Sequence, residues 1–351
     1  MKRLFFSIAF ILLIMAISGI SQAKVTGVCS NCHTMHNSQG GQPMAREYSG
    51  GSLVDDPDPN PALLINDCIG CHFDVGSSTI VGNTPIVLNA SLPTEALAGG
   101  NFYYVDQVDY ANGHNVASIS PQESPPMDVP PGFKENVSIP GGTGPASWDQ
   151  QLTCAGTWGC HGNRNEENPY ISIYGAHHTV GSIDGSTVGT SYRFLYGVLG
   201  AEHVTWEQGI VENPATHNGY KGNPDYAGMD TISYLCGQCH GNYHAHGSLG
   251  GTTQVGSTSP WLRHPCDISF SDVSGGYTNS EYADYTTYSS TAPVAYSSPT
   301  GSETTVDASS IIMCLSCHRA HGSPHYKLMR WDYKGWPPGT NGCNVCHTSK
   351  D

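Results

Sequence analysis

Six pairs of cysteines, each followed directly by a histidine, constrain this chain more than any other feature of its sequence. Five pairs have the spacing Cys-x-x-Cys-His. On a helical turn, residues i, i+3 and i+4 share one face, so two thiols and an imidazole are presented together. This spacing is the attachment sequence of c-type haem. The predicted thioether-forming cysteines are Cys29, Cys32, Cys68, Cys71, Cys236, Cys239, Cys314, Cys317, Cys343 and Cys346, and the predicted proximal iron ligands are His33, His72, His240, His318 and His347.

Other uses of paired cysteines fit this pattern less well. Zinc sites do not require a histidine directly after every second cysteine. Disulfides are common in exported proteins, but they do not explain the histidines. A thioredoxin-like redox site needs one such motif beside a βαβ unit, not five. The repeated pattern therefore predicts covalent haem.

The sixth pair is stretched, with five residues between Cys154 and Cys160 before His161. Gly156 and Gly159 would let the extra residues loop out while the last two residues keep the usual geometry. The alternative is a disulfide between the two cysteines. We expect a sixth haem, for a total of six haems c, and we expect the thirteenth cysteine, Cys266, to be a buried free thiol.

Eleven further histidines are available as second axial ligands. His36 and His321 lie three residues beyond a motif histidine. Neither can reach the far side of its own haem, so each is predicted to bind the iron of a neighbouring one. His178 is slightly preferred over the adjacent His177, and His217 competes with His244. The predicted distal ligands are His36, His114, His178, His217, His264 and His321.

The composition of the 351 residues predicts an unusual fold. Only 38% are hydrophobic, and 42 Gly and 23 Pro interrupt regular structure. We expect a mostly irregular chain with short helices at the motifs and a few short strands, in which the porphyrins serve as the core. Short β-prone pieces are expected in 78–88 and 101–110, and a short helix over 192–199.

The first 23 residues have a basic start, an apolar run and a final alanine, which is typical of a secretory signal peptide. Residues 24–351 are then a single multihaem unit with no further apolar run long enough to span a membrane. The formal charge is −15, and cleavage removes Lys2 and Arg3 but no acid. A chain this acidic is not expected to bind nucleic acid.

These features resemble the multihaem c-type cytochromes exported by metal-reducing bacteria. The six motifs, the two Cys-His-x-x-His extensions, Gly-His-Asn-Val at 113–116 and the run from Cys314 to Pro324 carry the resemblance. It implies low-potential, bis-histidine haems that carry electrons in the periplasm, outer membrane or cell surface. The implied partners are other redox proteins or extracellular electron acceptors, and some hexahaem relatives polymerise into filaments.

An alternative function is a multihaem reductase of a small nitrogen or sulfur compound. That chemistry needs one iron with an open face and acid–base groups beside it. A common sign is a lysine in place of the motif histidine, and no such motif occurs in this sequence. The surplus of histidines also favours irons that are closed on both faces, so an electron-transfer protein rather than an enzyme is expected.

Overall fold

The computed structural model describes residues 25, 27–120, 129–209, 217–244, 246–249, 266–272, 277, 282–334 and 342–348. Within these ranges the chain is mostly coil, as predicted. Its helices have three to six residues and its strands two to five. The predicted signal peptide and the predicted ligand His264 lie outside the described residues.

The described strands pair only in twos. The longest pair is the hairpin of β3 and β4, and the pairing of β5 with β8 is parallel. The strands are β1 (Ser38–Gln39), β2 (Gln42–Pro43), β3 (Ala45–Ser49), β4 (Ser52–Asp56), β5 (Phe73–Asp74), β6 (Ile80–Val81), β7 (Thr84–Pro85), β8 (Leu88–Asn89), β9 (Ser138–Ile139), β10 (Gly142–Thr143), β11 (Gly200–Ala201), β12 (Gly219–Tyr220), β13 (Ile268–Ser269) and β14 (Ile311–Ile312).

The helices are short, and at four of the five regular motifs they begin at the first cysteine, whereas α4 begins four residues before Cys236. The α-helices are α2 (Cys68–Cys71), α3 (Pro169–Ser172), α4 (Ile232–Gly237) and α5 (Cys343–Cys346). The remaining turns are η1 (Cys29–Asn31), η2 (Pro61–Leu63), η3 (Tyr104–Val108), η4 (Tyr110–Asn112), η5 (Ala176–His178), η6 (Tyr192–Phe194), η7 (Pro224–Tyr226), η8 (Gly241–Tyr243), η9 (Gly247–Leu249), η10 (Phe270–Asp272), η12 (Cys314–Ser316) and η13 (Tyr326–Leu328).

Two sequence-based expectations were wrong in their type of structure. Residues 101–110 form the helical turn η3 instead of a strand. Phe102 and Val105 are both buried in one cluster, and a turn brings residues three apart to one side, whereas a strand would point them to opposite faces. The helix expected over 192–199 is only η6, because the Phe194 carbonyl accepts a hydrogen bond from the N–H of Gly162.

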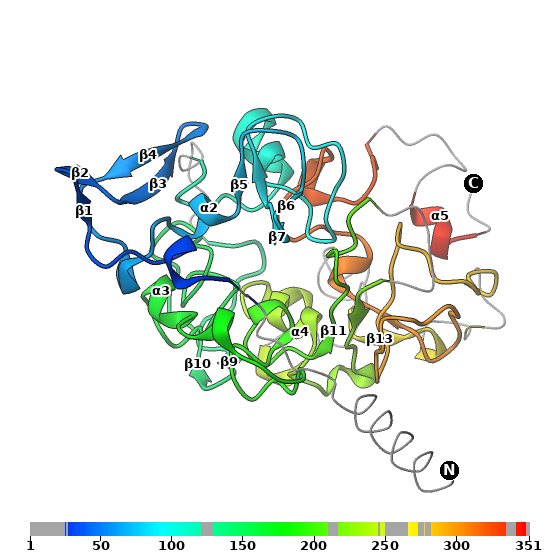
Figure 1. The fold of residues 1–351 in the computed structure, drawn as a ribbon. Helices are drawn as coiled ribbons and strands as arrows, with labels where there is room; N and C mark the ends of the chain where they lie inside the picture. Colours follow the sequence, from blue (N-terminus) through cyan, green and yellow to red (C-terminus); the bar gives the residue numbers. More distant parts are fainter. Residues whose placement is uncertain are drawn as a thin grey trace, which may run out of the picture.

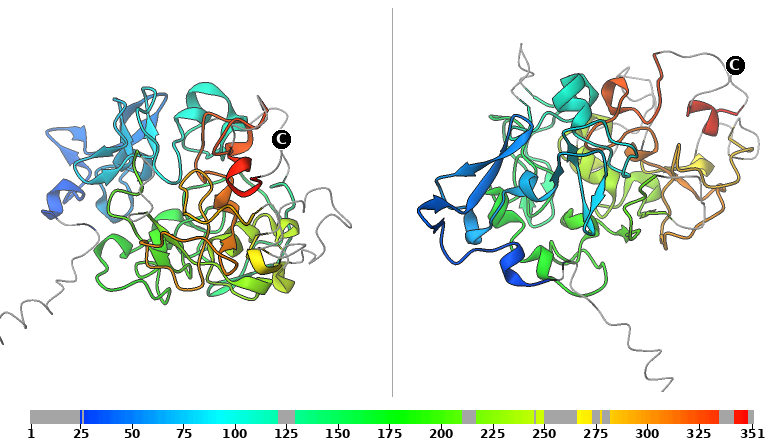
Figure 2. Two further views of the ribbon diagram at one scale, coloured as in Figure 1. Left: turned by 90° about the vertical axis from the view of Figure 1, so that its right-hand side faces the viewer. Right: turned by 45° about the horizontal axis from the view of Figure 1, so that its top comes forward.

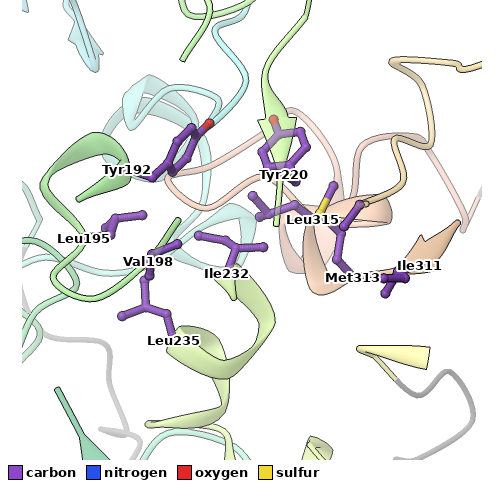
Figure 3. Close-up of a cluster of buried hydrophobic side chains, with 10 residues drawn as sticks. Tyr192, Leu195, Val198, Tyr220, Ile232, Leu235, Ile311, Met313 and Leu315 are labelled. Carbon is purple, nitrogen blue, oxygen red and sulfur yellow. The ribbon is translucent and has the colours of Figure 1, made fainter. Parts of the chain in front are cut away.

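The hydrophobic core is divided into small clusters. The largest contains ten buried residues, among them Tyr192, Tyr220, Ile232 and Met313, contributed by segments far apart in the sequence (Figure 3). Three further clusters have four to seven buried members each. Motif cysteines pack against three of the four clusters, so the apolar side chains surround the predicted haem sites instead of forming one continuous core.

The N-terminal strands β1–β4 and the C-terminal helix α5 lie at opposite ends of the molecule (Figure 1). A view turned about the horizontal axis also separates them (Figure 2). The second motif, at α2, lies on the side of β1–β4, and the last motif, at α5, lies at the far end (Figure 1). Among the described residues, no helix is both long and apolar enough to cross a membrane.

Candidate haem-binding sites

Each regular motif is closed by the same backbone hydrogen bond. The N–H of the motif histidine donates to the carbonyl of the first cysteine, four residues earlier, over 2.8–3.2 Å. This bond completes one helical turn and keeps both thiols and the imidazole on one side. At α2 the turn is also capped, since the Asp67 carboxylate accepts from the N–H of Gly70.

In the stretched motif, a loop allows the same backbone hydrogen bond to form. The N–H of His161 donates to the carbonyl of Cys154 over 3.1 Å, as in the five regular motifs, although seven residues separate the two. Gly156 makes the loop possible: its φ is +85°, and a Cβ there would lie 2.7 Å from the carbonyl oxygen of Glu166. Cys154 and Cys160 are free thiols and do not form the alternative disulfide.

One large cavity connects the motifs. Its volume is about 2970 Å³, and it is lined by at least one cysteine and the histidine of all six motifs. Sites for a single small molecule usually measure about 300–1,000 Å³, so this cavity has room for several large groups. Within the described ranges, no three His, Cys, Asp or Glu side chains converge to hold a metal ion.

The proximal imidazoles are oriented by the backbone. In five motifs the ring Nδ1 lies within hydrogen-bond distance of a carbonyl oxygen, and since a carbonyl only accepts, Nδ1 carries the proton and Nε2 is left to bind iron. The acceptors are Ala62 for His33 (2.9 Å), Pro85 for His72 (2.8 Å), Arg193 for His161 (3.0 Å), Pro131 for His240 (2.7 Å) and Lys327 for His318 (3.0 Å).

Four proximal histidines face a second histidine at a common spacing. The ring centres are 6.1 Å apart for His33 and His178, 6.5 Å for His72 and His177, 6.3 Å for His161 and His321, and 6.2 Å for His240 and His114. Imidazole nitrogens bind a metal at about 2.0 Å, and the ring centre lies about 1.1 Å behind the nitrogen, so two rings on one metal are roughly 6 Å apart. The four pairs therefore fit bis-histidine haem.

The adjacent histidines His177 and His178 serve two different motifs. The sequence analysis preferred His178 and left His177 as the competing choice, but the structure brings both to a proximal histidine. They are the last two residues of η5, where successive side chains point in different directions. In the sequence, the pair of adjacent histidines was the feature that could have indicated contacts with two motifs.

His114 and His321 come together from distant parts of the chain. The N–H of His114 donates to the carbonyl of His321 over 3.1 Å, and its Nδ1 contacts the carbonyl of Ala320 at 2.6 Å. Gly113 permits this crossing, because a Cβ there would lie 2.4 Å from the His321 carbonyl oxygen. Burial lowers the pKa of His114 to about 4 and that of His321 to about 3, so both rings are neutral at pH 7 and suited to bind iron.

His217 does not occupy the position that was predicted for it. Its ring stacks on Tyr288 at 3.6 Å, and its two nitrogens face the carbonyl oxygens of Asn218 (2.6 Å) and Glu303 (2.8 Å). Neither nitrogen is directed to iron, so this geometry is at odds with an axial role. The competing residue His244 is also engaged on both sides, by Asp267 and by the N–H of His246.

His36 lies on the surface, away from the four histidine pairs. The neighbouring Met35 is 90% exposed. The haem site of its own motif already has His178 opposite His33, so His36 is left facing outward. At the other end of the chain, the ring of Tyr282 lies 5.3 Å from that of His347.

The comparisons with known proteins agree with this chemistry. Residues 308–351 match the family model described as a doubled CXXCH motif. The chain is 24% identical to the C-type cytochrome OmcS of Geobacter sulfurreducens, over 87% of this chain and 78% of that protein. The chain is therefore similar to a multihaem c-type cytochrome over most of its length, and its last 44 residues match a doubled haem-attachment motif.

Two solved structures are similar to this chain. One is the outer membrane cytochrome S filament of Geobacter sulfurreducens, at 18% identity and a TM-score of 0.49, covering 93% of this chain and 100% of that chain. The other is the cryo-EM structure of OmcS nanowires from the same organism, at 19% identity and a TM-score of 0.46, covering 89% of this chain and 85% of that chain.

Proposed function

We propose that this chain is a cytochrome that binds six haems c and carries electrons among them in extracellular respiratory electron transfer. The observation that carries this proposal is the set of four histidine pairs, 6.1–6.5 Å apart, around a single cavity lined by all six motifs. An iron with a histidine on each face has no open position for a substrate. Such a site can exchange electrons but cannot bind and transform a small molecule.

When bound, haem supplies one-electron chemistry between ferric and ferrous iron. The residues of this chain fix where that chemistry occurs. Paired cysteines anchor each group, backbone carbonyls orient the proximal imidazoles, and the apolar clusters exclude water. The adjacent His177 and His178 keep the sites of the first two motifs close together. The crossing of His114 with His321 does the same for the sites of His240 and His161.

The haem count is tested by intact mass of the holoprotein. Wild-type protein should carry six haems, and Cys154→Ala should reduce the occupancy of the stretched motif because one thioether bond is lost. The matched control is Cys266→Ala, which removes a buried cysteine outside the motifs. Six full haems in Cys154→Ala would contradict attachment at the stretched motif.

The decisive experiment for function is low-temperature EPR of the fully oxidised protein, with the spins counted against the haem content. We expect only low-spin signals: four irons would have a histidine on each face, and the proposal extends this coordination to the haems of His318 and His347. A stoichiometric high-spin haem would contradict the closed-iron proposal. It would instead favour the alternative function, a reductase of a small nitrogen or sulfur compound.

We also propose that the cytochrome is exported through the signal at residues 1–23 and passes electrons to other redox proteins or to extracellular acceptors. Self-assembly into a filament is part of this proposal, and its support is the outward position of His36, which is free to bind a haem of a second copy. Light scattering and negative-stain microscopy should show assemblies for wild type and single chains for His36→Ala. Assembly that persists in His36→Ala would contradict this ligand, and His325→Ala is the control.

A further inference from the structure

We propose that Asp267 is a proton-binding site coupled to electron transfer, which takes up a proton when the neighbouring haems at the 236–240 and 314–318 motifs are reduced. This inference rests on the proposed function. Electron transfer among the haems does not require it, because haem reduction by itself needs no proton. It starts from a buried carboxylate that has no lysine or arginine beside it among the described residues.

Asp267 and His244 form a pair that is almost wholly enclosed. The Nε2 of His244 is 3.0 Å from Oδ2 of Asp267, and both side chains are 1% exposed. The hydroxyl of Thr231 donates to the same carboxylate oxygen over 2.6 Å. The other oxygen, Oδ1, is buried and has no hydrogen-bond partner among the described residues.

The hydrogen bonds identify which group carries the charge. The backbone N–H of His246 donates to Nδ1 of His244 over 3.0 Å, so Nδ1 is unprotonated and the ring proton is on Nε2. His244 is therefore neutral and donates to the carboxylate. The pair as a whole has one negative charge, located on Asp267, and a free carboxylate oxygen on which a proton can be placed.

The pair lies directly behind the part of the cavity wall where two haems attach. Cys266, the residue before Asp267, has its thiol within hydrogen-bond reach of Cys314, which in turn reaches Cys236. Cys314 and Cys236 are the first cysteines of two motifs. His244 and Cys266 both line the cavity. Because Asp267 is buried beside these motif cysteines, negative charge added at either haem would raise its proton affinity.

Among the described residues, the groups that surround Asp267 and His244 are mostly uncharged. From α4, the residues facing it are Thr231, the N-terminal cap, and Tyr234; from η7 it is Tyr226, and from the segment after η8 it is His246. Cys266, Cys236 and Cys314 complete the surroundings, and the last two become uncharged thioethers in the holoprotein. No lysine or arginine contacts Asp267 in the described part of the chain.

Burial raises the pKa of Asp267, and the hydrogen bonds from His244 and Thr231 offset only part of this effect. The position is also held at a backbone cost. Asp267 has φ +54°, an uncommon value for a residue with a side chain, and its N–H donates to the carbonyl of Ile312 over 2.7 Å. The backbone of Asp267 is therefore held in place by the fold, with its carboxylate in the interior.

The coupled step balances in electrons and protons. A ferric haem, the Asp267 carboxylate, one electron from the donor that feeds the cytochrome and one proton from water give a ferrous haem and the carboxylic acid. Oxidation by the acceptor reverses the step and releases the proton. Because the added electron and the carboxylate repel each other, reduction favours protonation, and protonation equally favours reduction.

The test is a spectroelectrochemical titration of the holoprotein at a series of pH values, together with proton uptake measured by an indicator dye. In wild type we expect reduction potentials that fall as pH rises across one window, with up to one proton taken up per chain in that window. Asp267→Asn should lose this proton and raise the potentials of the affected haems at high pH. The matched control is Asp272→Asn, an exposed carboxylate five residues further along.

A second variant guards against misfolding of Asp267→Asn. Thr231→Val removes one hydrogen bond to the carboxylate, which should move the window to higher pH without abolishing it. An unchanged pH profile in either variant would overturn the inference and assign the proton to another group, such as a haem propionate. EPR of the same samples tests the proposed function separately. If all irons are low-spin but the reduction potentials of the variants depend on pH as in wild type, only the proton site at Asp267 is contradicted.

Discussion

His177 and His178 are adjacent in the sequence, but their side chains face different haem motifs. Two neighbours on one tight turn each stand opposite a different proximal histidine, with ring centres 6.5 and 6.1 Å apart. Both side chains line the cavity that the motif histidines also line. If each is the second ligand of one haem, as we propose, its loss should change the coordination of that haem alone.

We predict that His177→Ala converts the haem of the 68–72 motif to a high-spin form, and that His178→Ala does the same for the 29–33 motif. The remaining haems should stay low-spin, because their ligands come from other segments. EPR and the high-spin visible absorption band measure the change. His325→Ala is the control, and a fully low-spin spectrum in both alanine variants would contradict the assignment.

At the scale of elements, the stretched motif shows how a loop can replace part of a helical turn. Five residues are looped out between Cys154 and Cys160, yet the hydrogen bond from His161 to Cys154 is the same as in α2 or α5. The loop depends on Gly156, whose backbone conformation and close approach to Glu166 leave no space for a side chain.

We predict that Gly156→Ala lowers the free energy of unfolding by more than the roughly 1 kcal/mol expected for a positive φ alone. The added methyl group would also push the loop from its place and reduce haem attachment at this motif. The control is Gly41→Ala, which has φ +81° but no atom within 4 Å of the added Cβ. Thermal unfolding and haem content measure both effects, and equal losses in the two variants would show that contact with Glu166 is unimportant.

For the whole molecule, the separation of the core into four small clusters has an energetic consequence. Each cluster buries four to ten hydrophobic residues around a cavity of about 2970 Å³. Close packing is needed for stability, and a cavity of this size would forfeit it if it were filled by water alone. The bound groups must supply the missing packing.

We therefore predict that chain produced without haem attachment does not reach the native fold. It should lack near-UV circular dichroism and be digested by protease within the time that leaves the holoprotein intact. Cys154→Ala, which affects one site of six, should stay folded. A protease-resistant apo chain with native near-UV signals would contradict a haem-dependent core.

The sequence predicted what depends on local spacing. The motifs, the loop at Gly156 and Gly159 and the mostly irregular fold could be inferred from residues close together in the chain, and the prediction that His321 faces a motif other than its own agrees with its position 6.3 Å from the ring of His161. Distal pairing could not, because it depends on contacts such as that between His114 and Ala320, 206 residues apart. His217 looked equally suitable as a ligand, and only its stacking on Tyr288 shows that it packs instead.

The hydrogen bonds from the proximal histidines to backbone carbonyls shift the reduction potentials of their haems in the same direction. A carbonyl that accepts a hydrogen bond from Nδ1 makes the imidazole more electron-rich, which stabilises ferric iron and lowers the reduction potential. Five motifs receive this same influence from the backbone, so it cannot rank these five haems against one another. Differences in reduction potential between these haems must come from features that differ between their sites, such as the charge on Asp267.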